Sequence, residues 1–231
     1  MTVGAVILAA TPASALAEAA GRASVRRIAE TAWAGGALPL VVVAADPEGT
    51  VAAALGGSEA TLVPPAPVES GPVGQIVRGV RATLELVAST DAALVWPARL
   101  TWVDAETVTS LLQAHGLDPA SCLRPTWDGT AGWPLLLPVR HLDAFAGLAR
   151  DRMPDDLVAD LAAAGVPLRE LDLGDPGAVL DRDTPIDALP PYAGPPEPLA
   201  PPPDWGAAAA DGPDDAPAAP IRTLDPDEPD A

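Results

Sequence analysis

Apolar runs and amphipathic stretches alternate along the first 189 residues of the chain. Short unbroken apolar runs are typical of strands covered on both faces, and we expect strands at 3–10, 38–45, 61–63, 92–96, 121–124, 135–137 and 168–173. Apolar residues spaced three and four apart predict helices at 23–34, before 56–57, from about 73 to 87, from 104 to 115, from 141, at 154–165 and from 183. This alternation predicts an α/β domain with a largely parallel sheet.

The segment 91–107, DAALVWPARLTWVDAET, is the expected centre of that domain. It contains the only place in the sequence where a buried strand, 92–96, is expected to end in a cleft. Because ligands bind at the carboxyl ends of parallel strands, residues 97–102 are the expected site of any chemistry. They contain Arg99 and no carboxylate.

The composition changes at Pro190. The last 42 residues hold 13 prolines, nine acidic residues and one arginine, too little apolar surface to offset the entropy of ordering a chain. We therefore expect one domain, residues 1–189, followed by a disordered acidic tail at 190–231.

The charge of the chain narrows the classes of partner. Its net charge is −19, and all 13 basic residues are arginines. Since a basic patch is the electrostatic footprint of nucleic-acid and anionic-membrane binding, we expect neither partner. The single cysteine, Cys122, excludes an internal disulfide and a cysteine-rich metal site, and its apolar surroundings predict a buried thiol.

The N-terminus has two interpretations. Its apolar run followed by Ala13-Ser14-Ala15 is similar to a signal peptide with a cleavage site. The run is short and no positive charge precedes it, which favours a first buried strand and a cytoplasmic protein. Cleavage after Ala15 would contradict both expectations.

Four segments, in order, carry a resemblance to a known family: VILAA at the first strand, ESGPVGQIVRGV at 69–80, RPTWDGTAGWPLLLP at 124–138 and LDRDTPID at 180–187. Together they resemble the MobA-like NTP transferases, the nucleotidyltransferases of molybdenum-cofactor synthesis. The resemblance implies a three-layer Rossmann-like nucleotidyltransferase fold with helices on both faces of the sheet. It also implies Mg²⁺ as cofactor, a nucleoside triphosphate, and transfer of its nucleotidyl group to a phosphorylated acceptor such as molybdopterin.

The phosphate loop departs from the pattern of this family. Members carry a glycine-rich loop with an arginine and a following lysine, whose backbone N–H groups cradle the triphosphate. Here Ala10 is followed by Thr11 in place of the first glycine, Pro12 has no N–H, and Ala15 replaces the arginine. The following segment is too short for the lysine, so Ala10 and Thr11 mark a nucleotide site whose cradle is lost.

The metal motif GDxP departs too, because Arg99 occupies the place of its aspartate. A hard cation needs oxygen ligands, and a guanidinium repels it. Arg99 is either a structural or surface arginine or a direct, bidentate phosphate ligand.

The acceptor side of the family pattern is better kept. Gly71 and Gly74 fit a loop that approaches a nucleotide or acceptor, or else a plain loop-to-helix turn. Arg124, Asp128 and Gly129 match a segment that faces the acceptor, although a tight Asp-Gly turn explains the last two without a ligand.

Two further groups of polar residues complete the candidates. Asp181 and Asp183 match a late metal-binding motif of the family, but the Asp-Thr-Pro sequence is also an ordinary helix start. His115 falls in the last turn of its helix, where a partly charged imidazole suits the helix dipole. Neither His115 nor His141 has the spacing of a catalytic or metal site.

Three hypotheses remain. In the first, the chain is a catalytically degenerate family member that binds a nucleotide, a phosphorylated small molecule or a protein partner. The second is an active Mg²⁺-dependent transferase, using CTP or GTP, in which Arg99, Arg22 and the 71–74 loop rebuild the phosphate site. The third is a Rossmann-like binding domain unrelated to the family. The missing lysine and metal aspartate favour the first.

Overall fold

The structure, a computed structural model, describes residues 1–195. Its strands and α-helices, in chain order, are β1 Val3–Leu8, α1 Pro12–Leu16, β2 Glu18–Ala19, β3 Arg22–Ala23, α2 Ser24–Ala34, β4 Leu40–Val43, α3 Thr50–Leu55, β5 Ala60–Val63, α4 Gly71–Leu86, β6 Ala92–Pro97, α5 Ala105–Leu117, β7 Cys122–Trp127, β8 Thr130–Ala131, β9 Leu135–Pro138, α6 Leu142–Ala146, α7 Pro154–Ala163 and β10 Leu168–Asp172. Single 3₁₀ turns are η1 Val68–Ser70, η2 Val139–His141, η3 Pro176–Ala178 and η4 Ile186–Ala188.

The main sheet is mixed but mostly parallel. Within residues 1–195 it has eight strands in the order β10-β7-β9-β6-β1-β4-β5, with β8 paired to β7. The pairs among β6, β1, β4 and β5 are parallel, as is β10 with β7, while β9 runs antiparallel between β6 and β7. This arrangement, with helices around it, confirms the predicted α/β class.

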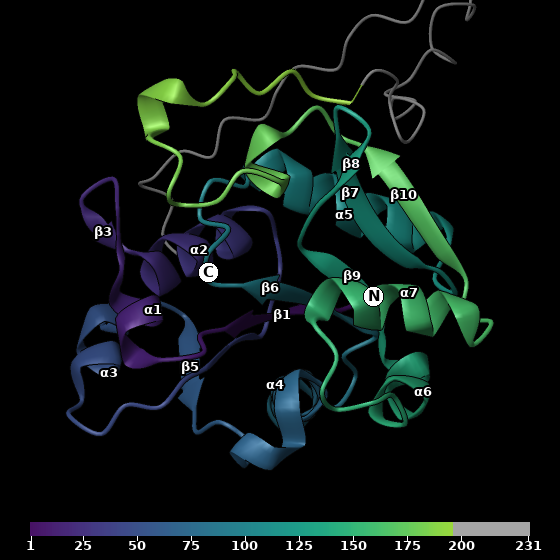
Figure 1. Cartoon of the computed structure of the whole chain (residues 1–231), viewed down its shortest axis with the longest axis horizontal. Coiled ribbons are helices and arrows are strands. Elements are labelled where there is room, and N and C mark those ends of the chain that lie inside the picture. Colours follow the sequence, from purple (N-terminus) through teal and green to yellow (C-terminus); the bar gives the residue numbers. More distant parts are fainter. Residues whose placement is uncertain (196–231) are drawn as a thin grey trace, which may run out of the picture. The chain divides into compact units, whose positions relative to one another are not determined.

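Helices cover both faces of the sheet. Both α2 and α4 pack on β1 and β4, but α2 packs with α1, α3 and α5, whereas α4 packs with α6 and α7. In Figure 1, α4 and α6 lie below the strands, and α2 and α5 lie above them. The three layers expected from the family resemblance are therefore present.

The centre of the sheet is fully buried, which explains the unbroken apolar runs. Ala5, Val6 and Ile7 of β1 have no exposed surface, and neither do the first five residues of β6. Gly79 lets α4 approach the sheet closely, because a Cβ there would lie 2.1 Å from Val6 Cγ1. A parallel core of this kind needs apolar residues on both faces.

Several predicted boundaries and elements need correction. The first strand ends at Leu8 rather than residue 10, and the strand predicted at 38–45 spans Leu40–Val43. Neither α1 nor the small β2–β3 hairpin was expected from the sequence, because both are too short to show a periodic pattern. The helix predicted from 183 is only the 3₁₀ turn η4.

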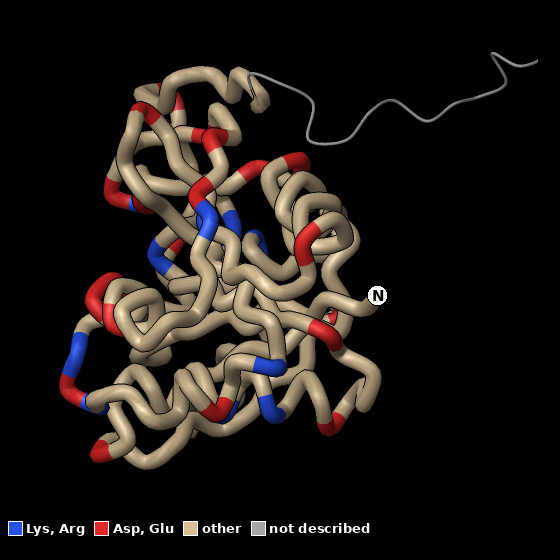
Figure 2. Tube along the Cα trace, turned by 90° about the vertical axis from the view of Figure 1, so that its right-hand side faces the viewer, with Lys and Arg blue, Asp and Glu red and all other residues tan. Residues whose placement is uncertain are grey.

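Acidic residues are spread over most of the visible trace in Figure 2, with arginines in smaller groups between them. Cys122 is buried as predicted, and burial raises the pKa of its thiol to about 12. No helix in residues 1–195 is long and apolar enough to cross a membrane.

The predicted acidic tail falls mostly outside the described residues, from 196 onward. Its first residues, 190–195, are described, and Ala193 N–H donates to Gly174 O at 3.0 Å. Burial raises the pKa of Tyr192 to about 12, and the nearby carboxylates of Glu106 and Asp104 act in the same direction. Residues just after the predicted boundary at 189 thus contact the domain, through Ala193 and Gly174.

Candidate functional site

The parallel strands β1, β4 and β6 end at one edge of the sheet, which we call the carboxyl edge. Their register is continuous, with Leu8 of β1 opposite Val43 of β4 and Pro97 of β6. In Figure 1 this edge lies to the left, beside α1 and α3. It is where an open α/β sheet binds ligands, and the sequence places Ala10, Thr11 and Arg99 there.

The turn after β1 forms a capped helix instead of an open phosphate loop. Ala10 and Thr11 are exposed, and Thr11 is the N-cap of α1. Thr11 Oγ1 accepts from Ser14 N–H at 3.1 Å, and Ser14 Oγ accepts from Thr11 N–H at 3.0 Å. Ala15 N–H donates to Thr11 O at 3.1 Å, and Pro12 has no N–H. The capping box thus uses the backbone donors that a cradle would direct at a phosphate.

Arg99 lies beside Asp181. This contact brings together the two segments that match the metal motifs of the family. Arg99 Nη1 is 3.7 Å from Asp181 Oδ2, with the side chains 51% and 30% exposed. Arg182 N–H donates to Arg99 O at 2.9 Å, and Arg182 Nη1 donates to Ser14 O at 3.2 Å. The segment around residue 182 therefore ties the β6 turn to α1.

A tryptophan and a second arginine support this turn. Trp102 Nε1 donates to Asp181 O at 2.9 Å and to Thr184 O at 3.1 Å. The Arg27 guanidinium carbon lies 5.0 Å from the centre of the Trp102 ring, and Arg27 Nε donates to Thr101 O at 3.0 Å. Thr101 Oγ1 is buried and has no hydrogen-bond partner in residues 1–195.

Asp175 is a buried carboxylate of this edge that the sequence did not single out. It is 2% exposed, and it accepts hydrogen bonds from Asp104 N–H at 2.9 Å, Thr107 Oγ1 at 2.6 Å and Gly177 N–H at 2.8 Å. Burial raises the pKa of this carboxyl, although the three hydrogen bonds oppose the shift. Its partners show that it joins η3 to the start of α5.

The residues present do not fit a Mg²⁺ site. Asp181 Oδ1 accepts from Asp183 N–H at 3.1 Å, Asp181 Oδ2 faces Arg99, and Asp183 is exposed. In the part of the chain that the structure describes, no three His, Cys, Asp or Glu side chains are grouped to hold an ion. Mg²⁺ requires several oxygen ligands, and a guanidinium beside the carboxylate opposes it. Nor does Asp183 cap a helix, since η4 has no side-chain cap.

Gly71 and Gly74, the two glycines singled out in the 69–80 segment, both meet protein atoms. Gly71 has φ of +58°, and a Cβ there would lie 1.8 Å from Arg150 O. A Cβ on Gly74 would lie 2.1 Å from Ser70 Cβ. These contacts with protein atoms explain why each position is a glycine, and the explanation needs no ligand.

Arg124 is a buried structural link. Its Nε donates to Gly132 O at 2.7 Å, its Nη2 pairs with Asp155, and its guanidinium carbon lies 5.5 Å from the centre of the Trp133 ring. Trp133 Nε1 donates to the same carboxylate at 3.0 Å. The side chain therefore joins β7, the turn before β9 and α7.

Asp128 and Gly129 form the turn of the β7–β8 hairpin. Both have positive φ, +49° and +70°, and Trp127 pairs with Thr130 across the turn. A type I′ turn requires such angles, so the hairpin alone accounts for both residues.

Of the residues singled out from the sequence, the structure brings Arg99 and Asp181 together and links them through Arg182 to the turn after β1. The contacts of the other predicted residues lie elsewhere: Gly71 against Arg150, Gly74 against Ser70, Arg124 against Asp155, and Asp128 and Gly129 in their hairpin. Sequence reasoning missed Arg27, Trp102 and Asp175. Only Trp102 gave a signal, since it lies in the segment expected to carry chemistry.

Residues 5–165 match the sequence model of the MobA-like NTP transferase domain. The chain belongs to this family. Among curated proteins, no sequence matches this chain.

Solved structures show the same fold for this MobA-like chain. A nucleotidyl transferase from Methanothermobacter thermautotroptrophicus is 20% identical, with a TM-score of 0.59 over 73% of this chain and 87% of its own. Rv0371c from Mycobacterium tuberculosis, solved with manganese, is 18% identical, with a TM-score of 0.57 over 75% and 88%. The 2-C-methyl-D-erythritol 4-phosphate cytidylyltransferase from Thermus thermophilus is 17% identical, with a TM-score of 0.56 over 77% and 91%.

Proposed function

We propose that this chain is a degenerate MobA-like protein that binds a phosphorylated ligand at the carboxyl edge and does not transfer a nucleotidyl group. The observation that carries the proposal is the Arg99–Asp181 pair, 3.7 Å apart at the end of β6. A positive side chain occupies the place where the resemblance to active members implies a metal ligand.

Arg99 is suited to contact a phosphate without a metal. Its side chain is 51% exposed, and its pair with Asp181 is too long for a strong hydrogen bond. N–H groups of the guanidinium therefore remain free to bind an oxyanion bidentately. The neighbouring arginines, Arg27 and Arg182, add positive charge at this edge of an otherwise acidic chain.

The hydrogen bonds of α1 support the proposed loss of nucleotidyl transfer. In-line displacement on a triphosphate requires several donors directed at its oxygens. Here Thr11 and Ser14 bond to each other, and Ser14 O already accepts from Arg182. A bound phosphate would have to break the cap or bind without it.

The competing function is a working CTP- or GTP-dependent transferase with a rebuilt phosphate site. It needs Arg22, Arg99 and the loop containing Gly71. Arg22 pairs with Glu30, and Gly71 lies against Arg150 O. Only Arg99 of these groups faces solvent without a close partner, which favours the binding function.

The names of the structural neighbours guide the choice of ligand. One is a cytidylyltransferase of a phosphorylated sugar-like alcohol, and another is a nucleotidyl transferase. We therefore propose a nucleotide or a phosphorylated small molecule as the ligand of this edge. A molybdopterin-like acceptor remains the candidate that the MobA resemblance supplies.

Titration calorimetry with CTP, GTP and ATP, with and without Mg²⁺, tests the proposal. We expect Mg²⁺ to leave the affinity unchanged and Mg²⁺-NTP to bind at least about a hundredfold more weakly than to an intact family member, since each lost charge-assisted hydrogen bond costs about 1.5–3 kcal/mol. Arg99→Ala should weaken any binding, whereas Arg81→Ala, a change of an exposed arginine on α4, should not.

The proposal fails if the protein releases pyrophosphate from CTP or GTP with a molybdopterin-like acceptor and Arg99→Ala abolishes that turnover. That result would establish the rebuilt transferase site. Restoring the carboxylate alone, by Arg99→Asp, should increase Mg²⁺ affinity without producing transfer, because the phosphate cradle remains absent.

A further inference from the structure

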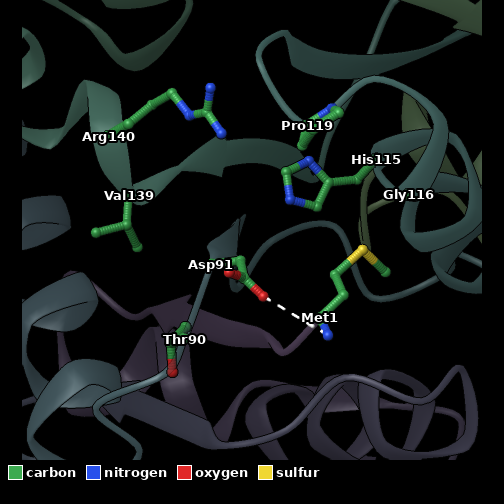
Figure 3. A pocket seen from close by; sticks show the side chains of 8 residues that line it. All are labelled: Met1, Thr90, Asp91, His115, Gly116, Pro119, Val139 and Arg140. Carbon is green, nitrogen blue, oxygen red and sulfur yellow. Dashed lines mark ion pairs between the residues drawn. The ribbon is translucent and has the colours of Figure 1, made fainter.

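A cavity lies at the end of the sheet opposite the carboxyl edge, and Figure 3 shows the side chains that line it. Its volume is about 530 Å³, within the range of small-molecule sites, and polar groups line it from several elements. Asp91 precedes β6, His115 is in the last turn of α5, and Arg140 lies in η2 after β9. The antiparallel β9 brings Arg140 here, since Pro138 at its end pairs with Ala92 at the start of β6.

His115 is the unexplained group of this cavity. It is 1% exposed, and neither ring nitrogen has a hydrogen-bond partner in residues 1–195. Burial lowers the pKa of His115 and so disfavours the charged imidazole that the sequence suggested for this helix end. A neutral imidazole has one donor and one acceptor, and leaving both unpaired costs free energy that a ligand would recover.

Arg140 supplies a positive charge directed at the same space. It is exposed and has no ion pair among the described residues, and in Figure 3 its guanidinium and the His115 ring point toward one another. Asp91 is already engaged, because its Oδ2 accepts from Thr2 N–H at 2.7 Å and lies 3.9 Å from the Met1 ammonium. The free charge of the cavity is therefore that of Arg140.

We propose that this cavity binds a small hydroxylated oxyanion, either a carboxylate or a phosphate ester. Arg140 pairs with the oxyanion bidentately, the His115 ring donates a second hydrogen bond, and a ligand hydroxyl faces Asp91. The Met1 side chain lies beside the ring, is 70% exposed and is unbranched, so it turns aside as the ligand enters. The site is separate from the carboxyl edge and does not depend on the function proposed for that edge.

The chain has only two histidines, which makes the test direct. The ring C–H resonances of His115 and His141 are followed by NMR at constant pH and ionic strength, and His141→Gln assigns them. Glycerol phosphate and malate serve as the phosphate and carboxylate probes. We expect a saturable shift of the His115 resonance with at least one probe while His141 stays unchanged.

Two variants test whether binding at Arg140 causes the shift of the His115 resonance. Arg140→Gln removes an exposed side chain and should weaken binding at least tenfold without lowering the melting temperature, whereas Arg81→Gln should leave binding unchanged. A response to one probe identifies the oxyanion, and a response to both shows a general oxyanion site. The proposal is wrong if neither probe shifts His115, if both histidines shift alike, or if Arg140→Gln binds as tightly as the unmodified protein.

Discussion

The two ends of the central sheet differ in whether their arginines and other polar side chains have partners. At the carboxyl edge Arg99 faces Asp181, Arg182 bonds to Ser14 O, and Asp175 accepts three hydrogen bonds. At the other end the buried His115 and the exposed Arg140 have no partners within residues 1–195. Within this described part of the chain, the charged groups at the edge where an open α/β sheet binds ligands thus make internal contacts, although Thr101 Oγ1 is unpaired there, whereas an imidazole and a guanidinium are left without partners at the opposite end.

The largest expected effect concerns the internal contacts of the carboxyl edge. Asp175→Ala leaves three donors without their acceptor, two of them on Asp104 and Thr107, and should lower the free energy of unfolding by about 3 kcal/mol. Urea denaturation measures the loss. Asp172→Ala is the control, since Asp172 is exposed and, among residues 1–195, accepts only from Gly174 N–H at 3.2 Å. Equal effects of the two changes would show that Asp175 does not hold this edge together.

The next effect concerns the opposite end and depends on pH. The folded pKa of His115 lies below the usual 6.5, so the unfolded chain binds a proton on this ring more readily than the folded chain does. The stability that the neutral ring contributes is therefore present above pH 6.5 and is lost as the pH falls through the folded pKa. The slope in that window is at most about 1.4 kcal/mol per pH unit. Asp91 and Asp118 oppose the shift, and Arg140 adds to it.

Denaturation at a series of pH values should therefore show a slope below pH 6.5 that His115→Gln removes. His141→Gln is the matched control, because His141 Nε2 has a partner, Ala120 O at 2.7 Å. A slope that survives in the His115 variant would assign the effect to other groups.

A smaller effect, of opposite sign, is expected at Thr101. Its buried hydroxyl has no partner, so Thr101→Val should leave stability unchanged or raise it by up to about 1 kcal/mol. Thr83→Val should lower it by about 1 kcal/mol, since Thr83 Oγ1 donates to Val80 O at 2.7 Å. If both changes destabilise equally, Thr101 has a partner such as an ordered water molecule or a ligand.

The smallest effect is expected from the half-exposed Arg99–Asp181 pair. Arg99→Ala should change stability by less than about 0.5 kcal/mol. Thermal melts with and without Mg²⁺ sharpen the test, since the unmodified protein should not respond to the ion and Arg99→Asp should be stabilised by it. Stabilisation of the unmodified protein by Mg²⁺ would show that Asp181 binds a cation despite Arg99.

The sequence predicted those features that depend on local pattern. Apolar runs located β1, β4 and β6, and Asp128-Gly129 located a hairpin turn. Sequence spacing could not reveal that Arg99 meets Asp181, because the two lie on segments that only the folded sheet brings together. The same holds for Asp175, whose partners lie at the start of α5, and for the direction of β9, which the apolar run of Leu135–Pro138 leaves open.

The strand order of the sheet also bears on self-association. The strand β10 lies at one end of that order and pairs only with β7 among the described strands. An exposed strand edge is a template for pairing with another chain unless charged side chains interrupt it. Arg169, Glu170 and Asp172 are exposed on β10, so charged side chains interrupt this edge. The β10 edge is thereby disfavoured as a template for pairing, unlike β5 at the other end of the strand order, whose residues Ala60–Val63 carry no charge.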